Sequence, residues 1–273
     1  MSLLEAIILG IIQGLTEFLP ISSSAHLVLV PFLLNWQLDE AFVFVFDVLV
    51  QMGTLVAVIV YFRKDLWNII RAWVNGLVQR KPFAEADSRL GWYLILATIP
   101  AAVLGLLVKD LVEAAFNSPL ATGLFLLLTA ALLVAAEKIG KRNRSMEQMN
   151  WKDALTIGAF QAISIFPGVS RSGSTITGGM TRHLDRPSAA RFSFLMSIPV
   201  MLAAGGMALL DLLDVPNLSQ FLPVMVAGFI SAAVVGYLSI RWLLSFLTRR
   251  TLYPFAIYCV VLSALVVVVS LLR

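Results

Sequence analysis

Long runs of apolar residues, separated by short polar stretches, make up most of this 273-residue chain. A helix needs about 20 apolar residues to cross a ~30 Å hydrocarbon core. Several of the runs reach that length, and each of them predicts a transmembrane helix. We predict six such helices, at roughly 41–62, 91–109, 119–137, 189–212, 220–247 and 252–272.

Two further apolar regions, 3–34 and 152–181, are interrupted at their centres by polar residues, proline and glycine or serine. The centre of the first reads TEFLPISSSAH, and the centre of the second reads FPGVSRSGST. Non-helical backbone at membrane depth is tolerated only where it is buried in protein or lines a wet cavity. We therefore expect each region to form a re-entrant helical hairpin that enters and leaves the membrane on the same side.

The composition agrees with a polytopic, all-α membrane protein. The chain is 59% hydrophobic and only 13% charged, whereas soluble domains carry roughly 25% charged residues. A transmembrane β-barrel would show short alternating segments instead of long apolar runs. The single cysteine, Cys259, excludes an intrachain disulfide and a metal site built from several cysteines.

The placement of charge predicts the orientation. Most of the 20 lysines and arginines fall in four connecting stretches, 63–90, 138–152, 182–191 and 241–250. With six spans and two hairpins, these stretches all lie on one side of the membrane. The other side carries Asp39, Glu40, Asp110, Glu113, Asp211 and Asp214, with Lys109 and Arg273 as its cations. The positive-inside rule then places both termini outside.

The two halves of the chain resemble each other. The stretch AIILGIIQGLTEFLPISSS, residues 6–24, aligns with ALTIGAFQAISIFPGVSRS, residues 154–172. Further on, PAAVLG at 100–105 aligns with SAAVVG at 231–236. The shared order of these matches indicates a duplication. Each copy holds one hairpin and three spans, and three is odd, so the second copy is predicted to be inverted in the membrane.

We therefore interpret residues 1–273 as a single integral membrane domain. Repeat one spans 1–137 and repeat two spans 152–273, joined by a basic cytoplasmic linker at 138–151. In inverted-repeat proteins, broken helices meet near the middle of the bilayer and form a polar site at the repeat interface. We expect the two polar tips of the hairpins to face each other.

The first tip offers acid–base chemistry. Gln13 and Glu17 are four residues apart and share one helix face, so they can ligate a divalent cation together, or Glu17 can act as a base. His26 can act as a general acid or base, or can activate Ser23 as a nucleophile, because the two residues are three apart.

The second tip suits an anion. The chain must turn after Pro167-Gly168, and Ser170 is a natural N-cap for a second short helix. The N-terminus of that helix would present free N–H groups to a phosphate. Arg171 would add bidentate donors, and the hydroxyl groups of Ser172 and Thr175 would complete the cradle.

We expect Ser22 of the first tip and Ser170 of the second to contact the substrate as well. The polar residues of both tips also have simpler explanations. Small residues at the tips, Ser22 among them, can instead serve only to let helices pack closely. Glu17 can be a proton-relay carboxylate in a transporter, or can form a structural ion pair with Arg171.

Both signatures resemble those of the undecaprenyl-diphosphate phosphatase family, also called bacitracin-resistance proteins. The first family signature is a Glu or Gln followed four residues later by Glu, a serine-rich stretch and a His, which QGLTEFLPISSSAH matches. The second is Pro-Gly-x-Ser-Arg-Ser-x-x-Thr, which PGVSRSGST matches at every fixed position. The resemblance extends over the whole chain and includes FSFLMSIP and PFAIY.

The resemblance implies a bacterial inner-membrane enzyme with six spans and two re-entrant hairpins, whose site opens to the outer, periplasmic face. It would hydrolyse undecaprenyl diphosphate to undecaprenyl phosphate and phosphate, which recycles the lipid carrier of peptidoglycan synthesis and confers bacitracin resistance. The family depends on a divalent metal, typically magnesium or calcium. The implied partners are the prenyl diphosphate lipid and the bilayer, with no nucleic acid. The oligomeric state stays open, a homodimer included.

The family roles transfer by motif. Glu17 and His26 are implied to be catalytic, and Arg171 to anchor the diphosphate. Gln13 and Glu17 form the metal-side pair, and Ser23 falls where a nucleophile has been proposed. The attacking group is not settled by the resemblance: it can be a serine, a histidine or a metal-bound water. Gln13 stands where Glu is also found in the family, which makes a weaker, neutral metal ligand. Ala25 stands where Gly is common.

Two other classes of function compare with a phosphatase. A lipid-phosphate transporter or flippase would also use inverted repeats with polar tips at mid-membrane. A lipid kinase is disfavoured, because the sequence contains no Walker-type phosphate-binding motif.

Overall fold

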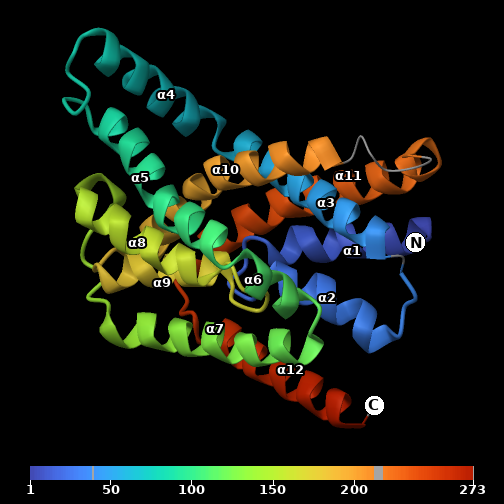
Figure 1. Ribbon diagram of the computed structural model, residues 1–273. Helices are drawn as coiled ribbons and strands as arrows, with labels where there is room; N and C mark the ends of the chain where they lie inside the picture. Colours follow the sequence, from blue (N-terminus) through green and yellow to red (C-terminus); the bar gives the residue numbers. More distant parts are fainter. Residues whose placement is uncertain (39, 212–217, 273) are drawn as a thin grey trace.

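The computed structural model describes residues 1–38, 40–211 and 218–272, and these residues form helices with no β-strand (Figure 1). The helices are α1 (Leu3–Thr16), α2 (Ser23–Leu34), α3 (Glu40–Tyr61), α4 (Arg63–Val78), α5 (Ala86–Leu107), α6 (Lys109–Phe116), α7 (Pro119–Ile139), the 3-10 turn η1 (Met146–Gln148), α8 (Trp151–Ile163), α9 (Arg171–Thr181), α10 (Arg186–Asp211), α11 (Leu218–Leu247) and α12 (Tyr253–Leu272). The prediction of an all-α membrane protein is confirmed.

Helices stand at all six predicted spans. By length and hydropathy, α5, α7, α12 and the Phe221–Leu247 part of α11 are long and apolar enough to cross a membrane, and α3 with α4 makes a fifth candidate if that bent pair is one span. Helix α10 covers the predicted span 189–212 up to Asp211, and residue 212 lies outside the described residues. The span count of six stays a prediction.

The stretch 63–90, which we expected to be a connecting loop, contains a helix. Helix α4 follows α3 with a bend of 77° and extends away from the rest of the molecule (Figure 1). Its basic residues alternate with apolar ones at helical spacing, for example Arg63 and Arg71 with Leu66 and Ile69. Such an amphipathic helix forms without being a span, and Ile69 is buried against the core. A basic stretch therefore indicated the side of the membrane but not the local structure.

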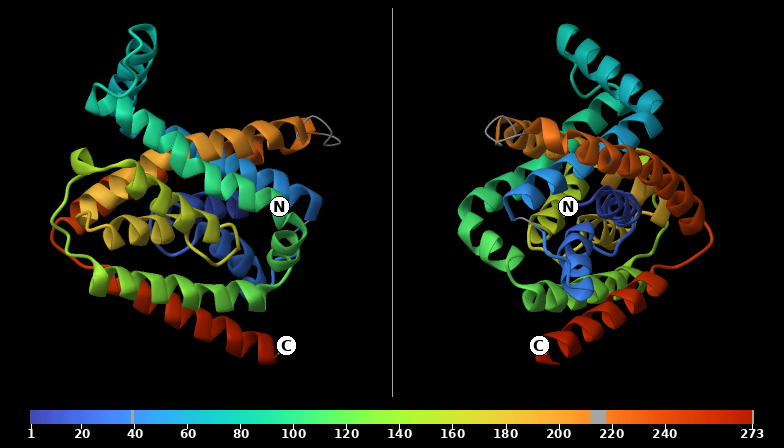
Figure 2. Two further views of the ribbon diagram at one scale, coloured as in Figure 1. Left: turned by 60° about the vertical axis from the view of Figure 1, so that its left-hand side comes forward. Right: turned by 90° about the vertical axis from the view of Figure 1, so that its right-hand side faces the viewer.

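Both interrupted regions form the expected pairs of short helices. Helices α1 and α2 are separated by residues 17–22, and α8 and α9 by residues 164–170. Proline weakens a helix interior, because it lacks an N–H donor and clashes with the preceding turn, and each break contains one, Pro20 or Pro167, among polar residues and glycine or serine. Prolines in apolar surroundings, such as Pro100 and Pro199, lie inside continuous helices. In Figure 2 both hairpins lie in the interior, with α7 and α12 on one side and α3, α5 and α11 on the other.

The first helix of each hairpin packs against a helix from the other half of the chain. Gly10 of α1 packs against the backbone of Gly228 in α11, and Gly158 of α8 packs against the backbone of Ala97 in α5. The sequence alignments pair Gly10 with Gly158 and Ala97 with Gly228, so the same close approach occurs twice. Such a pair of equivalent contacts is expected if the two halves of the chain arose by duplication. The repeat boundaries, the linker at 138–151 and the inverted orientation stay predictions.

The two termini lie at one end of the bundle, and the connections from α7 to α8 and from α9 to α10 lie at the other end (Figure 1). This agrees with a common side for both termini, and which side of the membrane that end faces stays a prediction. The acidic side chains of Glu40, Glu113 and Asp211, and all of Asp39 and Asp214, lie outside the described residues, as do the Lys109 side chain and Arg273.

Two buried carboxylates hold the end of the second hairpin at which α8 begins and α9 ends. Asp153 of α8 forms ion pairs with Arg144 and Arg182. Glu137 of α7 forms ion pairs with Arg142 and Arg186 and accepts a hydrogen bond from the backbone N–H of Leu252. These contacts tie α7, α8, α10 and the start of α12 together at the end of the bundle that carries the basic connections.

Candidate active site

The two hairpin tips meet at Glu17, which directly follows α1 and is 5% exposed. Its Oε1 atom accepts a hydrogen bond from Nη2 of Arg171 at 2.7 Å, across 154 residues of sequence. Its Oε2 atom accepts from Nε2 of Gln13 at 2.9 Å and from the hydroxyl of Ser23 at 2.5 Å. The prediction that the two polar tips face each other is confirmed.

The second helix of each hairpin begins in the same way. The hydroxyl of Ser22 accepts a hydrogen bond from the backbone N–H of Ala25, and the hydroxyl of Ser170 accepts one from the N–H of Gly173. Ser170 is therefore the N-cap of α9, as predicted. The first-turn N–H groups of α9 belong to Arg171 and the residues after it, and such groups have no acceptor within their own helix.

A threonine of α7 fixes the turn that precedes α9. The hydroxyl of Thr129 donates to the carbonyl oxygen of Gly168 at 2.8 Å and accepts from the N–H of Ser170 at 2.9 Å. Gly168 has a φ of 97°, a conformation that is open to glycine and strained for other residues. Sequence reasoning missed Thr129, because a single threonine in an apolar span carries no local signal.

Ser172 and Thr175 use their hydroxyl groups within the protein. The Ser172 hydroxyl donates to the carbonyl oxygen of Leu19 at 3.0 Å and so links the two hairpins. The Thr175 hydroxyl lies 2.6 Å from the hydroxyl of Ser193 in α10 and also bonds the Arg171 carbonyl oxygen. In this arrangement both residues hold α9 in place, and their predicted contact with substrate stays a prediction.

The ring of His26 points to residues other than Ser23. Its Nδ1 atom lies 2.7 Å from the carbonyl oxygen of Ser22, and its Nε2 atom lies 2.7 Å from the hydroxyl of Tyr258 in α12. The Ser23 hydroxyl bonds Glu17 instead. Of the two hypotheses for a base next to Ser23, the geometry therefore favours Glu17 over His26. Tyr258 was missed, and its only signal was its place in the PFAIY stretch.

Some buried polar atoms of the site have no hydrogen-bond partner among the described residues. They are Oε1 of Gln13 and Nη1 of Arg171. Each unpartnered buried group costs about 1–3 kcal/mol, which is recovered when a ligand supplies the missing partner. An unused acceptor beside Glu17 and an unused guanidinium donor fit a ligand that brings both a cation and an anionic oxygen.

The donor set fits a loosely held divalent ion. Within the described residues, no cluster of three or more His, Cys, Asp or Glu side chains is placed to hold a metal. Glu17 and the unpartnered Oε1 of Gln13 offer two oxygen ligands. Mg²⁺ is commonly bound in this way, through one or two protein oxygens, with phosphate oxygens and water completing the shell.

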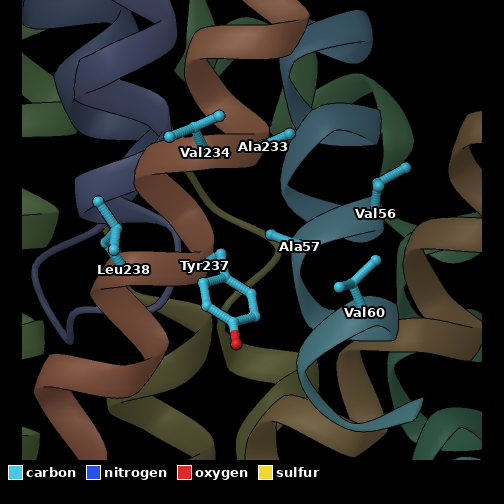
Figure 3. Close-up of a pocket in the computed structure, with 7 residues that line it drawn as sticks. All are labelled: Val56, Ala57, Val60, Ala233, Val234, Tyr237 and Leu238. Carbon is cyan, nitrogen blue, oxygen red and sulfur yellow. The ribbon is translucent and has the colours of Figure 1, made fainter.

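An apolar groove of about 400 Å³ runs between α3 and α11 on the outer surface of the bundle (Figure 3). It is lined by Val56, Ala57, Val60, Ala233, Val234, Tyr237 and Leu238. Its lining residue Ala57 lies close to the first hairpin, because a Cβ atom placed on Gly236 would lie 3.2 Å from Ala57 and 3.3 Å from the ring of Phe18. Phe18 is the residue next to Glu17, so the groove lies on the outer surface near the polar site.

The chain is similar to a known protein family over nearly its whole length. Residues 6–265 match the family described as bacitracin resistance protein BacA. The undecaprenyl-diphosphatase of Rubrobacter xylanophilus is 43% identical over 272 residues, which cover 100% of both chains. The undecaprenyl-diphosphatase of Myxococcus xanthus is 42% identical over 268 residues, 98% of this chain and 89% of the relative. This multi-pass membrane protein belongs to the BacA family.

Proposed function

We propose that this protein is an undecaprenyl-diphosphate phosphatase. It releases phosphate from the lipid diphosphate, returns undecaprenyl phosphate to peptidoglycan synthesis and thereby supports resistance to bacitracin. Membership of the BacA family and the printed names of the relatives support the activity. The observation in the structure that carries the proposal is the junction at Glu17, where a buried carboxylate, a serine hydroxyl and a guanidinium converge at a helix N-terminus.

The second hairpin binds the diphosphate in this proposal. Arg171 turns its guanidinium from Glu17 to the phosphate oxygens, which also satisfies its unpartnered Nη1 atom. The first-turn N–H groups of α9 that Ser170 does not engage, those of Arg171 and Ser172, add donors, and the positive end of the helix dipole favours the negative charge. Donors that are already fixed in place stabilise the charge that develops on the phosphate oxygens during the reaction.

The first hairpin carries the reaction. The Ser23 hydroxyl attacks the terminal phosphorus, and its proton passes to Glu17, 2.5 Å away. The bond from that phosphorus to the bridging oxygen breaks and releases undecaprenyl phosphate, and water then hydrolyses the phosphoserine. A nucleophile in hydrogen-bond contact with its base is the expected arrangement for such a step. If Ser23→Ala keeps its rate, water attacks directly.

A divalent ion completes this proposal. Gln13 and Glu17 would hold it, and magnesium or calcium suits their oxygen donors. When bound, such an ion neutralises charge on the phosphate oxygens and on the leaving group.

The prenyl chain lies in the groove between α3 and α11. The groove is apolar, faces lipid and lies near the residue next to Glu17. A substrate in this position keeps its hydrocarbon in the bilayer while its head group reaches the buried polar site. This explains why a phosphatase needs no soluble domain.

The proposed location is the bacterial inner membrane, with both termini and the opening of the site on the outer face. Cysteine labelling tests the orientation, because Cys259 is buried and gives a low background. A cysteine at Ser2 should react with an impermeant maleimide on intact cells, and one at Lys141 should react only after lysis. The reverse result would invert the proposed orientation.

The decisive test is phosphate release from a prenyl diphosphate by purified protein in detergent, with magnesium or with EDTA. We expect turnover by the wild type with magnesium only, and a loss of at least ~100-fold, or ~2.7 kcal/mol of barrier, in Glu17→Ala and Arg171→Ala. Arg71→Ala on the exposed part of α4 is the control. The phosphatase is excluded if neither the wild type nor the Arg71→Ala control releases phosphate.

The second candidate is a lipid-phosphate flippase. The exchange of helix partners between the two halves is the architecture of many transporters, and it supports this alternative. If detergent-purified protein releases no phosphate, transfer of a labelled prenyl phosphate between the leaflets of vesicles is the next measurement. Transfer that depends on Arg171 would favour the flippase.

A further inference from the structure

The last helix of the chain reaches into the first hairpin through one tyrosine. The hydroxyl of Tyr258 lies 2.7 Å from Nε2 of His26, across 232 residues of sequence. The two rings are also stacked, with centroids 5.6 Å apart and planes only 8° from parallel. His26 is 6% exposed, whereas Tyr258 is 42% exposed at the surface of α12.

The partners of His26 determine where its proton lies. Nδ1 faces the backbone carbonyl oxygen of Ser22 at 2.7 Å, and a carbonyl oxygen can only accept a hydrogen bond. Nδ1 must therefore carry a proton. In the neutral ring Nε2 is then an acceptor, and the Tyr258 hydroxyl is the donor that it faces. The ring is held from both sides in one tautomer and one orientation.

The carbonyl that receives this hydrogen bond belongs to a strained residue. Ser22 has a φ of 69°, in the left-handed region that costs a non-glycine residue about 1–3 kcal/mol unless its surroundings hold it. The backbone N–H of His26 also donates to the Ser22 carbonyl, at 3.3 Å. His26 therefore donates two hydrogen bonds to the carbonyl oxygen of the strained residue. The next residue is Ser23, whose hydroxyl must stay on Glu17.

The second hairpin provides a comparison within the same molecule. Its capping serine, Ser170, has an ordinary φ of −64°. At the position that aligns with His26 stands Ser174, whose hydroxyl has no partner among the described residues. The histidine is therefore present at the turn whose capping residue is strained, and absent at the turn whose capping residue is relaxed.

We propose that Tyr258 is a positioning residue that acts through His26: it braces the imidazole, which holds the strained Ser22 and so keeps the Ser23 hydroxyl on Glu17. This inference rests on the proposed phosphatase function for its kinetic consequence. Its structural content, the locked Nδ1–H tautomer of His26, does not depend on that function.

The kinetic test is Tyr258→Phe, which keeps the stacked ring and removes the hydroxyl. We expect kcat to fall roughly 10-fold, the effect of losing about one hydrogen bond, with KM changed by less than ~2-fold because no substrate contact is lost. Tyr253→Phe, on the same helix, is the matched control and should keep the wild-type rate. In a His26→Gln background Tyr258→Phe should have no further effect, since the tyrosine acts through the histidine.

The spectroscopic test is ¹⁵N NMR of the imidazoles. The chain has only two histidines, and His183→Gln leaves the signals of His26 alone. We expect the wild type to show a protonated Nδ1 and a bare Nε2, and Tyr258→Phe to shift the Nε2 signal by loss of its donor.

The outcomes separate the two proposals. An unchanged His26 spectrum and an unchanged kcat in Tyr258→Phe would overturn the bracing, and so would an equal loss in the His26→Gln background. A wild type that releases no phosphate defeats the proposed function alone, and the NMR result then decides the bracing by itself. Thermal unfolding of each variant separates loss of positioning from loss of fold.

Discussion

At the turn of the first hairpin, the hydroxyl of Ser22 caps α2 and lies 3.1 Å from the hydroxyl of Ser24. At the turn of the second, the hydroxyl of Ser170 caps α9 and lies 3.2 Å from that of Ser172. The alignment of the two halves pairs these serines position by position. The residue between them is Ser23 in one copy and Arg171 in the other, and both bond Glu17.

The comparison shows how two copies of one motif divide the work of a site. The shared capping hydrogen bond places the residue that follows each cap next to the same carboxylate, from two directions. The first copy carries the carboxylate and a hydroxyl, and the second carries Ile165 at the position of Glu17 and a permanent cation at the position of Ser23. A nucleophile with its base and an anion anchor thus arise from one pattern of serines, although the backbone at the two caps differs.

The starts of the two hairpins, at α1 and α8, also differ in how firmly they are held. At the start of α1, Glu5 and Ser2 form an exposed capping box. At the aligned start of α8, Asp153 and Asn150 form a capping box too, but Asp153 is buried and also bonds Arg144 and Arg182. Residues 172–180 of α9 are all buried. The second hairpin is therefore the more firmly anchored of the two, which suits the part that holds the diphosphate.

The largest effect is expected from making the two turns alike. Arg171→Ser gives the second turn the serine of the first and removes the anion anchor. Phosphate release should fall about 1,000-fold, the upper range for loss of one electrostatic donor. Ser174→Ala, whose hydroxyl bonds nothing described, should stay within about 3-fold of the wild type. A retained rate in Arg171→Ser, measured as phosphate release at saturating substrate, would contradict the division of work between the copies.

The two hairpin starts should differ in stability. Asp153→Asn leaves Arg144 and Arg182 without their buried partner, and the loss should be about 3 kcal/mol of unfolding free energy. Glu5→Gln, at the aligned position of the first hairpin, removes only an exposed capping contact and should cost less than ~1 kcal/mol. Thermal unfolding in one detergent measures both. Equal shifts of the unfolding temperature in the two variants would mean that burial of Asp153 adds no stability to the second hairpin.

The two aligned glutamines should differ in their effect on the metal. Gln13→Ala removes the unpartnered oxygen beside Glu17 and should raise the magnesium concentration for half-maximal activity about 10-fold. Gln161→Ala, on the second hairpin, should leave this concentration unchanged. Magnesium titration of phosphate release after EDTA treatment measures both. If this magnesium concentration changes in Gln161→Ala but not in Gln13→Ala, the metal is not bound beside Glu17.

The smallest effect is expected in the groove. Ala233→Phe fills the space between α3 and α11 and should raise KM for a long prenyl diphosphate about 3-fold, without changing KM for a short one. Ala102→Phe introduces the same ring at the aligned, lipid-facing position of α5 and is the matched control. An equal rise of KM in both variants, or for both chain lengths, would remove the prenyl chain from this groove.

Local sequence features predict the class of the fold and the functional groups that the site contains. Membrane helices follow from local apolar length, hairpin breaks from the polar residues around Pro20 and Pro167, and the cap at Ser170 from residue type. Glu17 and Arg171 stood out because ionisable residues are costly in a bilayer. These features depend only on neighbours in the chain, so they can be recognised there.

The packing of whole helices sets which functional groups meet. Thr129 fixes the Gly168 turn and Ser193 meets Thr175, and both sit in spans whose pattern predicts lipid or helix contact. His26 meets Tyr258 and not Ser23, and Ser23 meets Glu17. The contacts of Thr129, Ser193 and Tyr258 join distant parts of the chain and depend on how whole helices pack. Hydrophobic periodicity determines that a helix is buried, but the pairing of individual polar atoms depends on the packing of its neighbours.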